Sequence, residues 1–112
     1  MPPRDWRLRI QDILEAIEAV RRYVTGMNFN EFSQDQRTID AVVRRVTIIG
    51  EASVYVPEQV CTSCPEVPWA DMRAMRHFVV HEYFGVSEKI LWDTVQNDLP
   101  GIVEPLQRLL AA

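Results

Sequence analysis

The side chains best suited to chemistry gather in one short stretch, MRHFVVHEYFG. Both histidines of the chain, His77 and His81, lie in it beside Arg76, Glu82 and Tyr83. A histidine can accept and donate a proton near neutral pH, and an arginine carries a fixed charge on a planar fork that fits phosphate. RNA cleavage uses both functions, because a base activates the 2′-hydroxyl and a cation stabilises the charged transition state. The cluster therefore indicates phosphodiester chemistry, with a 2′,3′-cyclic phosphate as product.

Other interpretations of the same stretch stay open. An arginine and a histidine on an amphipathic helix are commonly surface or core-edge residues. The four-residue separation of His77 and His81 is also a metal-ligand spacing, but the stretch lacks the internal glutamate of an H-E-x-x-H protease and no third ligand is evident. Glu82 could act as a base, although it is only one of 16 acidic residues. Because the RNA itself supplies the nucleophile, we expect neither a metal nor another cofactor.

Helical geometry limits which of these side chains can meet. Successive residues of an α-helix turn by roughly 100°, so Arg76 and Tyr83, seven residues apart, share one face, and His77 and His81 share another. Arg76 and His81 are five residues apart, roughly 140° around the axis. For these two to meet, the helix must loosen towards Gly85, their side chains must converge, or a second subunit must complete the site.

The elements that position this stretch are predicted to be helices. The first ends near Gly26, since glycine is common just beyond a helix C-terminus. The second begins after Ser33, which with Gln36 fits a capping box, and continues to about Val56, where Pro57 stops it. Spacings of three and four define the apolar faces of these helices, which comprise Ile10, Ile13, Leu14, Ile17, Val20 and Val24, and then Ile39, Val42, Val43, Val46, Ile49 and Ser53.

The remainder of the chain alternates between breaks and shorter helices. Residues 57–68 contain three prolines and both cysteines and are predicted to form a loop. A third helix then runs to about Phe84, Gly85 interrupts it, Ser87 caps a fourth helix, and Pro100 begins a short fifth. We therefore expect an all-α fold, an up-and-down bundle of four main helices plus a short C-terminal helix.

Length and composition fit one globular domain, residues 1–112. The net charge of −4 and the pI near 5.1 argue against a broad basic face for nucleic acid, so any RNA contact must depend on a few arginines. No apolar run approaches the roughly 20 residues of a membrane span. The charged start, MPPRDWRLRI, lacks the apolar stretch of a signal peptide. We therefore expect no membrane contact and a cytoplasmic location.

Cys61 and Cys64 form a C-x-x-C pair. A zinc site needs four ligands and the chain has no second pair, while a redox C-x-x-C motif should follow a strand, and no strand pattern precedes this one. We interpret them as two thiols in a loop, with a redox or intersubunit role as the alternative.

The chain is also rich in large rings for its size. Such rings pack in a core or form a self-complementary dimer face, and we expect a homodimer. The rings are Trp6, Trp69, Phe78, Tyr83, Phe84 and Trp92.

The segment RHFVVHEYF resembles the R-x-x-x-x-H-x-Y motif of the HepT-like branch of the HEPN superfamily. The resemblance extends through RDWRLRIQDILEAI, IIGEASVYVP, PWADMRAMR and LWDTVQNDLPGIVEPL, and so covers Arg4 to Leu110. It implies a ribonuclease toxin whose catalytic residues are Arg76 and His81. It also implies that Tyr83 receives AMP from a partner nucleotidyltransferase, the MntA-like antitoxin of a type VII toxin–antitoxin pair, which silences RNA cleavage.

Three further residues are candidates for supporting roles. His77 stands where the family often has asparagine or another polar residue, and it could contact phosphate or orient His81. Glu51 either orients a site residue or is solvated. Arg73, one turn before the motif arginine, either extends the phosphate contact or lies on the surface. Gly50 is unfavourable inside a helix and is explained if another helix backbone passes close to it.

Two functions from other classes compete with this one. The chain could be a non-catalytic helical subunit that presents nucleotide or substrate to a nucleotidyltransferase, or it could be a plain dimeric scaffold. Neither alternative needs the arginine and histidine of the motif for RNA cleavage, so substitution of these two residues distinguishes them from a ribonuclease.

Overall fold

The computed structural model describes residues 5–77 and 85–111, with side chains for 5–77 and 88–111. Every regular element in these ranges is helical, which confirms the all-α prediction. No helix in this part of the chain is long and apolar enough to cross a membrane. The elements are α1 (Trp6–Tyr23), α2 (Phe29–Ser33), α3 (Gln36–Val54), α4 (Glu58–Ser63), α5 (Trp69–Ala74), the 3-10 turn η1 (Met75–His77), α6 (Gly85–Asp93), the π-helical turn η2 (Thr94–Asp98), the 3-10 turn η3 (Pro100–Ile102) and α7 (Val103–Ala111).

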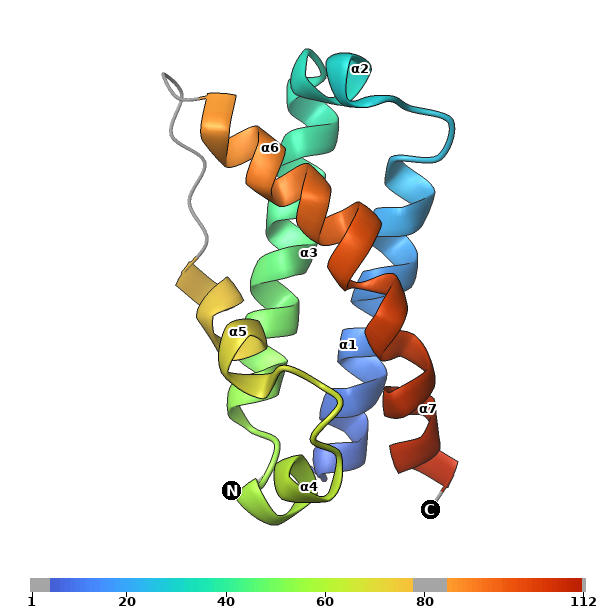
Figure 1. Ribbon diagram of the computed structural model, residues 1–112, viewed down its shortest axis with the longest axis vertical. Helices are drawn as coiled ribbons and strands as arrows, with labels where there is room; N and C mark the ends of the chain where they lie inside the picture. Colours follow the sequence, from blue (N-terminus) through green and yellow to red (C-terminus); the bar gives the residue numbers. More distant parts are fainter. Residues whose placement is uncertain (1–4, 78–84, 112) are drawn as a thin grey trace.

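The bundle is built on the antiparallel pair α1 and α3, the two long helices that run side by side in Figure 1. α5 and η1 lie against α3 on one side of this pair, and α7 lies against α1 on the other. The run from α6 to α7 crosses the bundle and descends to the end at which α1 begins. The elements thus alternate in direction, as the predicted up-and-down bundle requires.

The core lies between α1, α3 and the α6–α7 run. On α1 and α3 the predicted apolar faces are buried, apart from the half-buried Leu14 and Val43. Burial of such rows is the main source of stability for helices in a small domain. The α6–α7 run completes the core with Leu91, Val95, Leu99, Ile102 and Leu106.

The described aromatic rings are mostly used inside this core. Trp69 is buried, and its indole Nε1–H donates to the Cys64 carbonyl oxygen at 3.0 Å. Phe32 is fully buried, with its ring centroid 5.1 Å from that of Trp92. These rings therefore stabilise the monomer and do not themselves indicate a dimer face. Three of the rings considered above lie outside the described residues: Phe78, Tyr83 and Phe84.

The start of α3 differs from the sequence prediction. The capping box between Ser33 and Gln36 is wrong, because Ser33 ends α2 and its hydroxyl donates to the Asn30 carbonyl oxygen at 3.0 Å. Asp35 caps α3 instead, and its carboxylate accepts the Thr38 N–H at 3.1 Å. The acidic side chain two positions later takes the role because Ser33 is still inside the preceding helical turn.

Short helices occupy two segments that were expected to be irregular. α2 begins with a reciprocal capping box, in which the Asn28 and Glu31 side chains accept each other's backbone N–H. α4 forms within the predicted loop of residues 57–68, because Pro57 supplies an extended residue in front of a helical turn.

The predicted third and fourth helices have different boundaries. The third is α-helical only as far as Ala74, and the tighter turn η1 continues it to His77. Its predicted extension to Phe84 lies outside the described residues. α6 begins at Gly85, so Ser87 lies within the helix and the prediction that it caps the helix is wrong. Glycine is itself tolerated at a helix start.

A π-helical turn joins α6 to the C-terminal helix. The Leu99 N–H donates to the Thr94 carbonyl oxygen, five residues back, at 3.0 Å. Pro100 has no N–H to continue that pattern and stands at the first position of η3, as the sequence predicted. The change of direction lets α6 pack on α2 and α7 pack on α1.

We expect the Asp35 cap to give a pH-dependent contribution to stability. The hydrogen bond from the Thr38 N–H lowers the pKa of the Asp35 carboxyl, so the stabilisation is present above the unfolded value, about 3.9, and is lost as the pH falls through the lower folded value. Asp35→Ala should therefore be less stable than the wild type near neutral pH, and urea unfolding should show that gap narrowing in acid.

Ser33→Ala is the matched control for the cap, because it removes the hydroxyl from the residue that the sequence pattern favoured. It should unfold at nearly the wild-type urea concentration. A loss as large as that of Asp35→Ala would place the cap at Ser33.

Candidate active site

Gly50, inside α3, allows a second stretch of backbone to touch this helix. A Cβ atom built on Gly50 would lie 2.1 Å from the Arg76 backbone nitrogen and 2.7 Å from both the Arg76 Cα and the Met75 carbonyl carbon. Real Cβ atoms essentially never come within 3.0 Å of such atoms. The expectation that another backbone passes close to Gly50 is confirmed, and that backbone belongs to Arg76. We call this approach the Gly50 contact.

The side chain of Arg76 is exposed. Its Nε–H donates to His77 Nε2 at 3.0 Å, so His77 acts as the acceptor in this hydrogen bond. No carboxylate among the described residues forms an ion pair with Arg76. Among the residues that the structure describes, none forms a hydrogen bond or ion pair with the two terminal amino groups of this guanidinium.

The α-helical angle between Arg76 and His81 does not apply through η1, because a 3-10 turn advances by roughly 120° per residue. His81, Glu82 and Tyr83 lie outside the described residues, so their positions relative to Arg76 stay predictions. Glu51, which follows Gly50, is exposed and forms no hydrogen bond or ion pair with another described residue.

Arg73 lies one turn before Arg76 and has a different environment. It is half-buried, and its Nη2 donates to Cys61 Sγ at 3.2 Å and lies 3.9 Å from Glu58 Oε2. Its charge is therefore directed at α4, and it links α5 to that helix. This placement gives Arg73 a structural contact, and its proposed phosphate contact stays a prediction.

Both cysteines are free, buried thiols; the predicted loop position is wrong for Cys61, which lies in α4, and correct for Cys64, which follows that helix. Cys61 lies in α4 and donates to the Val56 carbonyl oxygen (Sγ–O 3.7 Å), and Cys64 donates to the Pro105 carbonyl oxygen (Sγ–O 3.9 Å). Burial raises the pKa of both thiols. Within residues 5–77 and 85–111, no three His, Cys, Asp or Glu side chains are grouped to hold a metal ion.

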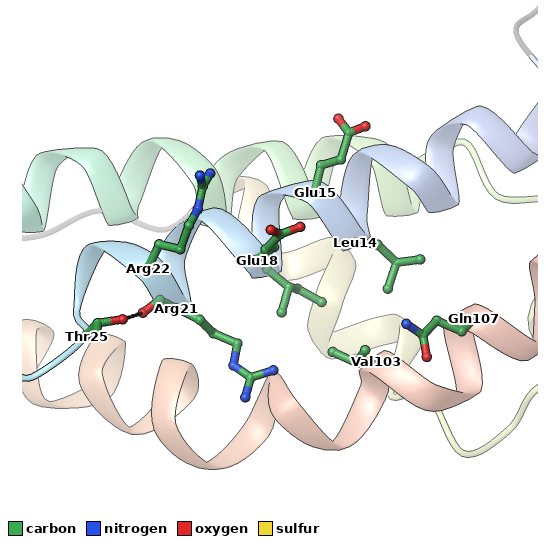
Figure 2. Close-up of a pocket in the computed structure, with 9 residues that line it drawn as sticks. Leu14, Glu15, Glu18, Arg21, Arg22, Thr25, Val103 and Gln107 are labelled. Carbon is green, nitrogen blue, oxygen red and sulfur yellow. Dashed lines mark hydrogen bonds between the residues drawn. The ribbon is translucent and has the colours of Figure 1, made fainter.

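A groove lies elsewhere, between α1 and α7 (Figure 2). It has a volume of about 610 Å³ and contains no residue of α3, α5 or η1. Arg21 extends from α1 towards α7, and Gln107 reaches back from α7. Because glutamates and arginines line it together, the groove lacks the uniform positive charge that phosphate favours. The lining residues are Leu14, Glu15, Ile17, Glu18, Arg21, Arg22, Thr25, Val103 and Gln107.

Comparisons with known proteins agree over almost the whole chain. The family model "Ribonuclease HepT-like" matches residues 13–109. A Methanocaldococcus jannaschii protein named "Putative RNase MJ0127" is 36% identical over 110 residues, covering 98% of this chain and 91% of that protein. A Thermococcus cleftensis protein named "Probable ribonuclease HepT" is 39% identical over 100 residues, covering 89% of this chain and 91% of that protein. No solved structure matches the chain.

We expect both thiols to react with a disulfide reagent only after the protein unfolds. Burial keeps the reagent away from the sulfur atoms, and each unit by which the thiol pKa rises lowers the fraction of reactive thiolate about tenfold. The release of coloured thiolate should be slow for the native protein and fast in urea. Ser63→Cys adds an exposed thiol on α4 as a positive control. Equally fast reaction of native Cys61 or Cys64 would contradict their burial.

Proposed function

Because this chain belongs to the HepT-like ribonuclease family, we propose that it is a single-domain, metal-independent endoribonuclease whose catalytic residues are Arg76 and His81. The observation that carries the role of Arg76 is its exposed guanidinium, which no described carboxylate pairs with, on a backbone packed against Gly50. A fixed cation of this kind suits the phosphate group of RNA, both for binding and for stabilising added negative charge.

The proposed reaction needs only groups of the protein and of the RNA. His81 removes the proton of the 2′-hydroxyl, whose oxygen forms a bond to the adjacent phosphorus. The bond from phosphorus to the 5′-oxygen breaks, and that oxygen takes a proton. The products are a 2′,3′-cyclic phosphate and a 5′-hydroxyl end. Arg76 stabilises the extra negative charge on the phosphate oxygens during the displacement.

A homodimer would supply the second proton-transfer group. In an in-line displacement the attacking and departing oxygens lie on opposite sides of phosphorus, so one imidazole cannot readily reach both. The histidines of this chain are only His77 and His81, and His77 Nε2 is engaged by Arg76. A second copy of His81 would therefore act as the acid. In the same arrangement His77 supports catalysis by orienting the guanidinium.

The finer assignment is the toxin of a type VII toxin–antitoxin pair in the cytoplasm. In this proposal an MntA-like nucleotidyltransferase transfers AMP from ATP to Tyr83: the phenol oxygen attacks the α-phosphorus, pyrophosphate leaves, and the phenol proton passes to a base of the transferase. The new phosphodiester carries a negative charge and a bulky base. Close to Arg76, it would neutralise the cation and occupy the space that RNA needs.

We expect Arg76→Ala and His81→Ala each to lower RNA cleavage in EDTA by at least about 100-fold, because each removes transition-state stabilisation or proton transfer. Arg108→Ala is the matched control, since Arg108 is an exposed arginine on α7 paired with Glu66. It should cleave like the wild type. Labelled single-stranded RNA of mixed sequence, resolved on a denaturing gel, provides the measurement. Equal activity in all four proteins would disprove the proposed site, and inactivity of every folded, unmodified protein would favour the non-catalytic subunit.

Tyr83→Phe tests the proposed silencing, because phenylalanine lacks the oxygen that would accept AMP. Incubated with the nucleotidyltransferase and ATP, the wild-type chain should gain the mass of one AMP group and lose RNA cleavage. Tyr83→Phe should keep its mass and stay active. Tyr55→Phe, which changes an exposed tyrosine of α3's C-terminus, should be silenced like the wild type. Full silencing of an unmodified Tyr83→Phe protein would overturn the role of Tyr83.

A further inference from the structure

We propose that Gly50 is a positioning residue of the ribonuclease site. Its lack of a side chain allows the Arg76 backbone to lie directly on α3, and this distance determines where the guanidinium meets the scissile phosphate. The inference rests on the proposed function, because Gly50 acts on the reaction only through Arg76.

The contact is between two backbones, and it therefore leaves no room for a side chain on residue 50. The three atoms nearest to a Cβ on Gly50 are the Arg76 nitrogen, the Arg76 Cα and the Met75 carbonyl carbon. A flexible side chain could swing aside, whereas these atoms belong to a helical turn that can move only as a unit. Moving the Arg76 nitrogen from 2.1 Å to the 3.0 Å lower limit requires a shift of about 0.9 Å.

Gly26 and Gly101 do not share this constraint. Gly26 has a positive φ of 79° beyond the end of α1, and Gly101 lies in η3, and a Cβ on either would meet nothing within 4 Å. Among these three glycines, Gly50 alone is required by the packing of another segment. Glycine is also strongly disfavoured inside a helix, so the position calls for a reason of this kind.

Little else in the described part of the chain would correct a displaced Arg76. The side chain is exposed, and its only hydrogen bond to a described residue is with its neighbour His77 in the same turn, which would move with it. The preceding residue, Met75, is half-buried and packs against the core. A displacement of about 1 Å at a catalytic group can lower the rate about 100-fold.

The experiment measures kcat and KM for cleavage of labelled single-stranded RNA in EDTA by the full chain. Gly50→Ala should lower kcat by about 100-fold with a much smaller change in KM, because the cation is displaced and not removed. Gly101→Ala is the matched control and should keep the wild-type kcat. Thermal unfolding of each protein shows which variants are folded at the assay temperature.

A double substitution separates positioning from a general loss of structure. In the Arg76→Ala background, adding Gly50→Ala should leave the residual cleavage unchanged, because the group that Gly50 positions is already absent. A merely structural role would lower cleavage by the same factor in both backgrounds, and that result would overturn the inference. So would a folded Gly50→Ala protein with wild-type kcat.

Met75→Ala tests the same contact if Gly50→Ala does not fold. It keeps Gly50 but removes the side chain that packs the turn against the core, so the Arg76 backbone should lift from α3 and kcat should fall by at least about tenfold. Wild-type kcat in a folded Met75→Ala protein would overturn the inference. Full cleavage by Arg76→Ala would overturn the proposed site and this inference together. If Arg76→Ala is inactive but the Gly50 and Met75 variants keep the wild-type kcat, only this inference is overturned and the proposed site remains.

Discussion

The Gly50 contact is the constraint on which the arrangement of this site depends. Two backbones approach more closely than any side chain on residue 50 would permit, and one of them carries Arg76. The exposed guanidinium is thus attached to the interior of the bundle through its own main chain. A long, flexible side chain gains a defined origin in this way, which reduces the conformational entropy that must be lost when it binds phosphate.

The surrounding helices make that origin rigid. α3, which contains Gly50, is packed along its length on α1 through two rows of buried aliphatic side chains. Arg73 connects α5 to α4, and Trp69 connects the start of α5 to the Cys64 carbonyl group. These interactions fix both ends of the short α5 segment. The backbone of Arg76 is therefore held by well-packed helices, although the turn η1 that contains it has only three residues.

The long helices could be predicted from sequence because their apolar spacing is repeated over five turns, and no other periodicity fits it. The cap at Asp35 could not be predicted, since Ser33 and Asp35 are both favoured N-cap residues and only the geometry of α2 decides between them. Gly50 was recognisable as a close approach, because glycine is costly inside a helix. The residue that approaches Gly50 could not be predicted, because it depends on how α5 and η1 lie across α3. No sequence pattern predicted the groove between α1 and α7, since the residues that line it come from segments far apart in sequence.

The Gly50 contact also affects how a working copy of such a protein is recognised in a genome. The proposed catalytic residues form a short sequence motif, but Gly50, against which the Arg76 backbone packs, lies 26 residues earlier, inside an ordinary helix. On the proposed role of Gly50, a gene that preserves the motif and changes this glycine to a larger residue would encode an impaired ribonuclease that a search for the motif alone would not detect. Sorting active from decayed copies thus requires reading two distant positions together, and at the earlier one the size of the residue matters more than its chemistry.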